Sequence, residues 1–225
     1  MRYIALGDSI SIDAYPQHDT GKSGLGAASL FFRNDDKFWP EFRGRDLRTL
    51  HPGIAFDNLT ADGATSDDVI RDQLPRIAHL NDETIVTVTA GGNDMLMNLR
   101  SPHPPARLVA GMIERIERIV GWLQSNITNS TILLGTVYDP SDGTNTLDGE
   151  RLDREAGWLS QFNEAVRSIA KQRAARVRLI DIHRHFLAHG VAAPQRARWY
   201  WSQLIFEPNA RGASEVRRLW LDALP

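Results

Sequence analysis

The chain has 225 residues, of which 42% are hydrophobic, so it can bury a sizeable core as one globular domain or at most two small ones. Its 26 basic and 28 acidic side chains give a net charge of −2, which provides no electrostatic basis for binding nucleic acid or an anionic membrane surface. It contains no cysteine, which excludes disulfides, a thiolate nucleophile and a cysteine-bound metal.

The N-terminal sequence "MRYIALGDSI" contains only three apolar residues in a row before a Gly-Asp-Ser turn. That run is too short for the core of a signal peptide, so we interpret it as a first strand. No segment approaches the ~18 apolar residues that a membrane-spanning helix needs. We therefore expect a cytoplasmic protein without a transmembrane segment.

Short runs of β-branched and aliphatic residues recur along the chain and predict five strands. They are residues 2–6, 54–58, 84–89, 131–137 and 176–180. Three of these runs are almost continuously apolar, as strands buried on both faces of a parallel sheet require.

Helical patterns separate several of these strands. Apolar residues at three- and four-residue spacing predict helices over 107–124, 159–169 and 213–223. A weaker pattern predicts a helix over 69–77, with Ser66 as its N-cap. This alternation of strands and helices predicts an α/β fold with a mostly parallel sheet, whose ligands bind beyond the carboxyl ends of the strands.

The stretch 13–50 interrupts the alternation with four glycines, two prolines and clustered charges. We interpret it as a loop-rich insertion over the carboxyl edge of the sheet, where a lid or a pocket wall would lie. A second polar loop, residues 139–150, follows the fourth strand at the same edge. We expect residues 1–225 to form a single domain around this sheet.

Three segments that follow predicted strands carry residues suited to acyl transfer. "LGDSI" places Ser9 after the first strand, "NLTADGATSDDV" places Gly63 after the second and "TAGGNDM" places Asn93 after the third. Taken singly, each segment is explained as well by a helix cap, a turn glycine or an ordinary loop. Together they supply a hydroxyl nucleophile, a backbone N–H donor and an amide donor at one sheet edge, which are the parts of a serine nucleophile with an oxyanion hole.

In order and spacing, these segments resemble the sequence blocks of the SGNH (GDSL) hydrolase family of esterases and acylhydrolases, and the resemblance covers the chain nearly end to end. It implies a flavodoxin-like three-layer α/β/α sandwich with about five parallel strands. It also implies Ser9 as the nucleophile, Gly63 and Asn93 as oxyanion donors, a small-molecule ester as substrate and no cofactor. Nothing in the sequence indicates an oligomeric state.

The last block departs from the family's usual Asp-x-x-His-Pro. Here "LIFEPNARGASEV" keeps Pro208 and Asn209 but has Glu207 in place of the histidine and Leu204 in place of the aspartate, and no Asp-x-x-His occurs anywhere in the chain. A glutamate can accept the Ser9 proton, although its ordinary pKa of ~4.3 makes it a weaker base than histidine at ~6.5. Apolar neighbours would raise that pKa. We therefore predict a Ser9–Glu207 dyad.

Two other assignments for the base stay open. Glu207 could be a structural acid paired with Arg211 or Arg217, and His183, after the fifth strand, could then act as a reserve base. If neither serves, the chain is a catalytically silent relative that binds a ligand in the same pocket.

Asp8, Asp94 and Trp201 are the residues that we expect to border the substrate. The two aspartates could instead cap helices or bond within loops. With Glu207 they could also bind Mg²⁺ or Ca²⁺ through hard oxygen ligands, which would make a carboxylate–metal hydrolase. Serine chemistry without a metal is the reading that we prefer.

Overall fold

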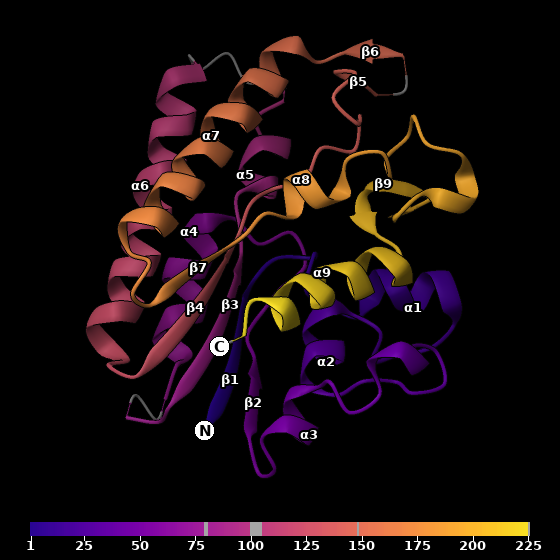
Figure 1. Ribbon diagram of the computed structural model, residues 1–225. Helices are drawn as coiled ribbons and strands as arrows, with labels where there is room; N and C mark the ends of the chain where they lie inside the picture. The colour runs from indigo at the N-terminus through magenta and orange to yellow at the C-terminus, as the bar shows by residue number, and fades with distance from the viewer. Residues whose placement is uncertain (79–80, 100–104, 148, 225) are drawn as a thin grey trace.

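The structure is a computed structural model and describes residues 1–78, 81–99, 105–147 and 149–224. In these residues, a sheet of five parallel strands has the order β2-β1-β3-β4-β7. The strands are β1 (Arg2–Gly7), β2 (Ala55–Asn58), β3 (Thr84–Thr89), β4 (Ser130–Gly135) and β7 (Val177–Ile180). They correspond to the strands predicted from the sequence, and their order is that of flavodoxin-like sheets (Figure 1).

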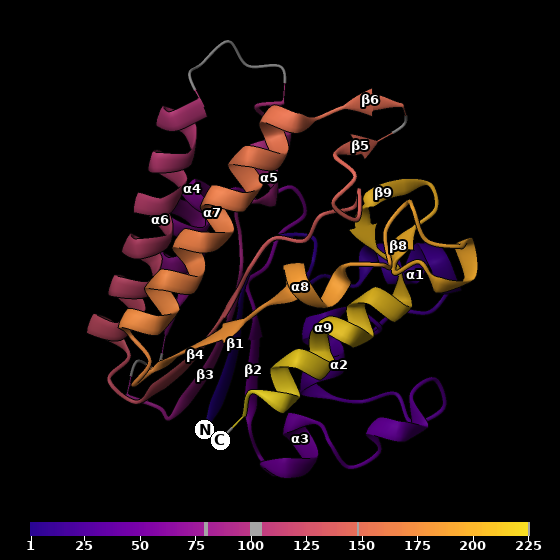
Figure 2. The ribbon, with the colours of Figure 1, turned by 45° about the horizontal axis from the view of Figure 1, so that its top comes forward.

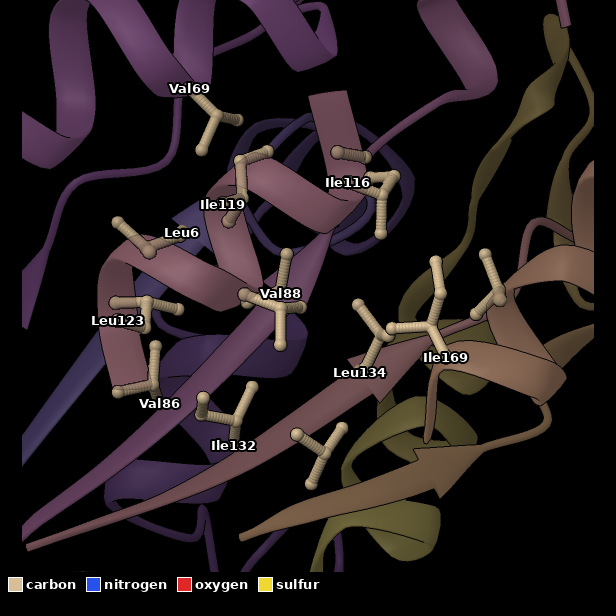
Figure 3. Close-up of a cluster of buried hydrophobic side chains, with 14 of the residues drawn as sticks. Leu6, Val69, Val86, Val88, Ile116, Ile119, Leu123, Ile132, Leu134 and Ile169 are labelled. Atoms are coloured by element: carbon tan, nitrogen blue, oxygen red, sulfur yellow. The ribbon is translucent and has the colours of Figure 1, made fainter. Parts of the chain in front are cut away.

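One face of the sheet is covered by α6 (Pro105–Asn126) and α7 (Asp153–Gln172). Successive strand residues point to opposite faces, and Val88 of β3 points into this layer. There it belongs to a buried apolar cluster with Ile116 and Ile119 of α6 (Figure 3). The apolar periodicity that predicted the two helices thus marks their buried sides.

The other face is covered by α2 (Ala27–Phe32) and α9 (Ala210–Asp222). Tyr3 of β1 meets Phe31 of α2 edge-on, with ring centroids 5.1 Å apart, and Phe31 lies 5.5 Å from the ring of Trp220 in α9. All three side chains are fully buried. Helices on both faces of the sheet make the predicted three-layer α/β/α sandwich, which confirms the fold class.

The stretch 13–50 contains more helix than its sequence suggested. It forms α1 (Ala14–Thr20), α2, the 3₁₀ turn η1 (Pro40–Phe42) and α3 (Leu47–Leu50). Helix α1 contacts the strands β8 (Tyr200–Trp201) and β9 (Leu204–Pro208) at the carboxyl edge of the sheet. Helix α2 instead lies beside α9, so the stretch supplies part of a helical layer as well as a border to the edge.

The weak helix predicted over 69–77 is a run of three short helical pieces: α4 (Ser66–Asp68), the π-helical η2 (Val69–Gln73) and the 3₁₀ turn η3 (Leu74–Arg76). Its predicted N-cap, Ser66, is wrong. Thr65 is the cap, because its hydroxyl accepts the Asp68 N–H at 3.2 Å and the Asp68 carboxylate accepts the Thr65 N–H at 2.8 Å. This reciprocal pair is a capping box.

The carboxyl ends of the parallel strands lie at one edge of the sheet, and further elements gather above them (Figure 2). They are α5 (Gly92–Leu96), α8 (Ile182–Phe186), the hairpin of β5 (Thr146–Leu147) with β6 (Glu150–Arg151), and the hairpin of β8 with β9. In the described ranges, no helix is both long enough and apolar enough to span a bilayer.

Candidate active site

The turn after β1 holds Ser9 in a fixed position. Gly7 has φ +123°, and a Cβ there would lie 1.7 Å from the carbonyl oxygen of Thr89, so only glycine fits. The side chain of Gln73 donates to the Gly7 carbonyl and accepts its N–H, both at 2.8 Å. Both backbone groups of Gly7 are therefore hydrogen-bonded, which fixes the backbone just before Ser9. Ser9 itself is only 4% exposed.

Glu207 is placed by β9 and by the start of α9. The hydroxyl of Tyr138 donates to the carbonyl oxygen of Phe206 at 2.5 Å, which fixes the backbone just before the glutamate. After it, the side chain of Asn209 caps α9 by accepting the N–H of Gly212 at 2.9 Å. Glu207 therefore lies between two anchored points of the backbone and is 6% exposed.

Ser9 and Glu207 meet although 198 positions separate them in the sequence. The hydroxyl Oγ of Ser9 donates a hydrogen bond to Oε1 of Glu207 at 3.0 Å. The other carboxylate oxygen, Oε2, is buried without a hydrogen-bond partner among the described residues. Buried polar atoms without partners are uncommon in folded proteins, and Oε2 is the only carboxylate oxygen among the six such side-chain atoms in the described residues.

The environment makes Glu207 a stronger base than an ordinary glutamate. Burial, opposed by the hydrogen bond from Ser9 and reinforced by the charges of Asp8 and Asp62, raises the pKa of Glu207 from 4.5 to about 8. Burial likewise raises the pKa of Asp8 from 3.8 to about 7. The pKa of Glu207 thus reaches or passes the ordinary value of histidine, ~6.5, although the side chain is a carboxylate.

The two predicted oxyanion donors lie on loops that bond to one another. Asn93, in the first turn of α5, donates from Nδ2 to the carbonyl oxygen of Ala64 at 3.1 Å. Ala64 directly follows Gly63, whose φ of +69° favours glycine. An asparagine amide has two N–H groups, so Asn93 can hold this loop with one and donate to a ligand with the other.

A cavity of about 110 Å³ opens beside the nucleophile. Ser9, Asn93 and Glu207 all line it, together with Asp8, whereas Gly63 does not, and most of its remaining lining is apolar. The arrangement places a hydroxyl, a carboxylate that accepts its hydrogen bond and a side-chain amide beside a cavity. Chemically, it is suited to acyl transfer.

A family model for GDSL-like lipases and acylhydrolases matches residues 5–214. The chain belongs to the GDSL-like lipase/acylhydrolase family. The predicted resemblance is therefore confirmed, and the chain is related to enzymes that hydrolyse esters.

Solved structures include similar folds. An extracellular lipase from Streptomyces rimosus is 18% identical, with a TM-score of 0.66 over 100% of both chains. An acetyl xylan esterase is 15% identical, with a TM-score of 0.70 over 100% of both chains. A catalytic mutant of an acetylxylan esterase from Geobacillus stearothermophilus is 18% identical, with a TM-score of 0.68 over 99% of this chain and 93% of the other. At such identities the likeness to these solved structures shows the fold alone. A search of curated protein sequences finds no match.

The residue three positions before Glu207 is not an aspartate. Leu204 stands where the family's usual aspartate would be and is 39% exposed, whereas Glu207 is buried. Both lie on β9, and residues three apart on a strand point to opposite sides. An orienting carboxylate at position 204 would therefore face away from position 207.

The arginines considered as structural partners of Glu207 do not pair with it. Arg217 is buried and donates to Asn34 at 2.8 Å and to the hydroxyl of Ser214 at 2.5 Å. Arg211 is exposed on the surface of α9. The geometry thus supports the contact with Ser9 over a structural ion pair.

His183 lies among groups other than the nucleophile. Its backbone N–H donates to the hydroxyl of Thr136 at 2.9 Å. Burial and the positive charge of Arg167 lower the pKa of His183, against the opposing effects of Asp139 and other carboxylates. His183 does not line the cavity that Ser9 and Glu207 line, so the structure gives no support to His183 as the reserve base.

Asp94, predicted to border the substrate, is occupied by structural bonds. Its carboxylate accepts the N–H of Ser66 at 2.8 Å, the hydroxyl of Ser66 at 2.6 Å and the guanidinium of Arg115 at 2.9 Å. It does not line the cavity. In the described part of the chain, no three side chains of His, Asp or Glu gather as a metal site would require, so the carboxylate–metal alternative gains no support.

Trp201 lies on the rim of the site, beside α1. Its ring stacks on His18 with centroids 5.4 Å apart and lies 5.8 Å from Tyr15. The hydroxyl of Tyr15 donates to Asp62, and the negative charge of Glu207 contributes to raising the pKa of Tyr15. Trp201 thus reaches the neighbourhood of Glu207 through Tyr15 but does not line the cavity itself.

Two residues that position the site were missed in the sequence. Tyr138 directly follows the fourth predicted strand run, which is a signal that could have suggested it. Gln73 lies in the π-helical turn η2 and offered no such signal, because its contact with Gly7 depends on how that turn packs against β1.

Proposed function

We propose that the chain is a serine ester hydrolase in which Glu207 replaces the usual histidine base. The observation that carries this proposal is the 3.0 Å hydrogen bond from Ser9 Oγ to Glu207 Oε1. That distance lies in the range, about 2.6–3.2 Å, expected between a nucleophile and its general base.

In the first half-reaction, ionised Glu207 takes the proton from Ser9 as Oγ attacks the carbonyl carbon of the ester. The carbonyl oxygen becomes an oxyanion, which Asn93 and the backbone N–H of Gly63 stabilise. The tetrahedral intermediate then breaks its bond to the alcohol oxygen. Glu207 returns its proton to that oxygen, so the alcohol leaves neutral and Ser9 carries the acyl group.

In the second half-reaction, a water molecule takes the place of the alcohol. Glu207 removes a proton from the water, and the resulting hydroxyl attacks the acyl carbon. Ser9 then leaves and recovers its proton from Glu207, which releases the carboxylic acid. A glutamate needs no aspartate in this cycle, since the aspartate of a triad orients and stabilises an imidazolium that does not form here.

The alcohol portion of the ester has a suitable surface on the rim. The base must reach the leaving oxygen, so the alcohol lies near Glu207. Tyr15 and Asp62 lie close enough to Glu207 for their charges to interact with it, and Trp201 packs against Tyr15. Aromatic rings with a hydroxyl and a carboxylate are suited to binding a polar alcohol such as a sugar.

The pH dependence of p-nitrophenyl ester hydrolysis tests the proposal. Glu207 accepts a proton only when it is ionised, so we expect kcat/KM to rise with pH with a midpoint near 8, the value to which burial raises its pKa. The activity should also persist in EDTA. A midpoint below 6.5 would indicate His183, whose pKa is lowered from that value, and loss of activity in EDTA would indicate a metal-dependent hydrolase.

The amide of Asn93 should act mainly in the transition state. We expect Asn93→Ala to lower kcat by about 10²–10³-fold with little change in KM, because an oxyanion donor is aimed at charge that is absent from the ground state. Steady-state kinetics on a p-nitrophenyl ester measure both constants. Asn98→Ala, on the turn after α5, is the matched control and should leave both nearly unchanged. A rise in KM alone in Asn93→Ala would assign the residue to substrate binding.

A further inference from the structure

The cavity beside Ser9 has strongly apolar walls. Side chains of α5 and the turn after it form one wall, and side chains of β5 and α7 form the facing parts. The apolar residues that line the cavity from these elements and the residues next to them are Leu96, Leu99, Leu147, Leu152, Ala156 and Leu159. The rim near Tyr15 instead combines aromatic rings with a hydroxyl and a carboxylate. The site thus offers an apolar surface to one half of an ester and a partly polar surface to the other.

Two polar residues of the lining, Asp139 and Asn145, are already hydrogen-bonded to nearby protein groups. Asp139 accepts the N–H and hydroxyl of Ser141 at 2.8 and 2.7 Å and the N–H of Gly143 at 2.9 Å. The amide of Asn145 donates to Asp153 at 3.2 Å. A substrate hydroxyl placed in the apolar part of this cavity would lose its bonds to water, which is unfavourable without replacement partners.

One end of the cavity is tied together by Arg154. Its guanidinium donates to the carbonyl oxygen of Leu99 at 3.0 Å and to Glu155 at 2.7 Å, and it stacks over the ring of Trp158 at 4.7 Å. Leu99 follows α5 and Glu155 lies on α7, and both line the cavity. Arg154 thus joins α7 to the turn after α5, which holds these two parts of the lining together.

We propose that this cavity binds the acyl chain of a medium-length, unbranched carboxylic ester of about six to eight carbons. An acetyl group would leave most of the apolar wall uncovered. An apolar cavity of about 150 Å³ in another protein takes up a six-carbon ring, so the cavity here, of about 110 Å³, holds about six carbons at most, and the end of a longer chain extends past its open mouth. The inference rests on the proposed function, because it places the ester carbonyl at Ser9 and extends its chain away from Glu207.

The test is a series of p-nitrophenyl esters from acetate to dodecanoate, which share one leaving group and differ only in the acyl chain. Each buried methylene should raise kcat/KM by about fourfold. We expect hexanoate, which has four more methylenes than acetate, to exceed acetate by about 250-fold, and dodecanoate to gain nothing over octanoate. A maximum at acetate would overturn the inference.

A substitution that fills the cavity provides the second part of the test. Ala156→Phe adds a ring to the lining from α7 and should remove the preference for octanoate over acetate. Ser160→Phe adds the same ring to an exposed position of the same helix and should leave the chain-length profile unchanged. Circular dichroism verifies folding of both variants. An unchanged profile in Ala156→Phe would also overturn the inference.

A binding measurement separates failure of this inference from failure of the proposed function. If the parent hydrolyses no ester, the proposed function fails. Calorimetric titration of the parent with octanoate then tests, without any turnover, whether the cavity binds an alkyl chain. Binding that Ala156→Phe abolishes and Ser160→Phe keeps would uphold an alkyl-chain site, and absence of binding to the parent would reject it.

Discussion

Replacing Ser9 by alanine should abolish ester hydrolysis, with kcat falling by about 10⁴–10⁶-fold, as expected when a catalytic nucleophile is removed. The variant should still fold. It loses one buried hydrogen bond to a carboxylate, which changes the free energy of unfolding by about 1–3 kcal/mol. Turnover of a p-nitrophenyl ester measures the loss of activity, and circular dichroism verifies that the variant folds.

Ser11→Ala is the matched control for this variant. Ser11 is also buried in the turn after β1, and its hydroxyl bonds to the hydroxyl of Thr89 at 3.0 Å instead of to Glu207. Its substitution removes the same group two residues away and should leave turnover within a few-fold of the parent. Undiminished turnover in Ser9→Ala would remove Ser9 from the mechanism.

Glu207→Gln should lower kcat by about 10²–10⁴-fold, because glutamine keeps the size and polarity of the side chain but cannot accept the Ser9 proton. The same change should stabilise the protein at high pH. Since the folded-state pKa of Glu207 is raised to about 8, its contribution to stability is present below the unfolded-state pKa of 4.5 and is lost as pH rises towards 8. Relative to the parent, Glu207→Gln should thus gain roughly 2–4 kcal/mol of unfolding free energy between pH 5 and pH 8.

Glu215→Gln should behave in the opposite way. Although burial raises the pKa of Glu215, hydrogen bonds from His185 and Arg218 bring it down to about 2. A lowered pKa stabilises the folded state at every pH above the unfolded-state value of 4.5, so Glu215→Gln should destabilise the protein by a similar amount at pH 5 and at pH 8 and leave catalysis nearly unchanged. Urea denaturation at pH 5 and pH 8 separates the two variants. Equal pH dependence in Glu207→Gln and the parent would contradict a raised pKa at Glu207.

The expected gain in stability and loss of activity when Glu207 is replaced both follow from how this carboxylate is buried. A buried carboxylate with one unbonded oxygen is unfavourable for folding, and Glu207 has no ion-pair partner among the described residues. Sites that hold a group at an unusual pKa commonly lower the stability of the fold that carries them. The pKa of Asp8, raised by burial to about 7, adds to the same effect.

The strands and the two long helices could be predicted from the sequence, because period-2 and period-3.6 patterns of apolar residues depend on which face of an element is buried. The stretch 13–50 could not, because short helices such as α2 carry too few residues to show a period. The N-cap at Thr65 was misassigned to Ser66 for a related reason. Both residues can cap a helix. The hydroxyl of Ser66 bonds instead to Asp94, which is 28 positions away in the sequence, so local sequence alone could not reveal this contact.

The candidate site could be predicted in part. Ser9 and Asn93 follow buried strands, and parallel strands bring their carboxyl ends together, so their convergence followed from the fold class. The placement of Glu207 depended on the match of its neighbours Pro208 and Asn209 to the family's last block. Asp94 also follows a strand, but the direction of its side chain was decided by Arg115, on a helix distant in the sequence.

The most direct test of the central claim, that Glu207 activates Ser9, is the rate at which a fluorophosphonate labels Ser9. This reagent reacts with an activated serine and needs no knowledge of the natural substrate. We predict that the parent and His183→Ala label at similar rates at pH 8.5, that mass spectrometry places the label on Ser9, and that Glu207→Gln labels at least 100-fold more slowly. Labelling of Glu207→Gln at the parent's rate, with loss of labelling in His183→Ala, would contradict the account and assign the base to the histidine.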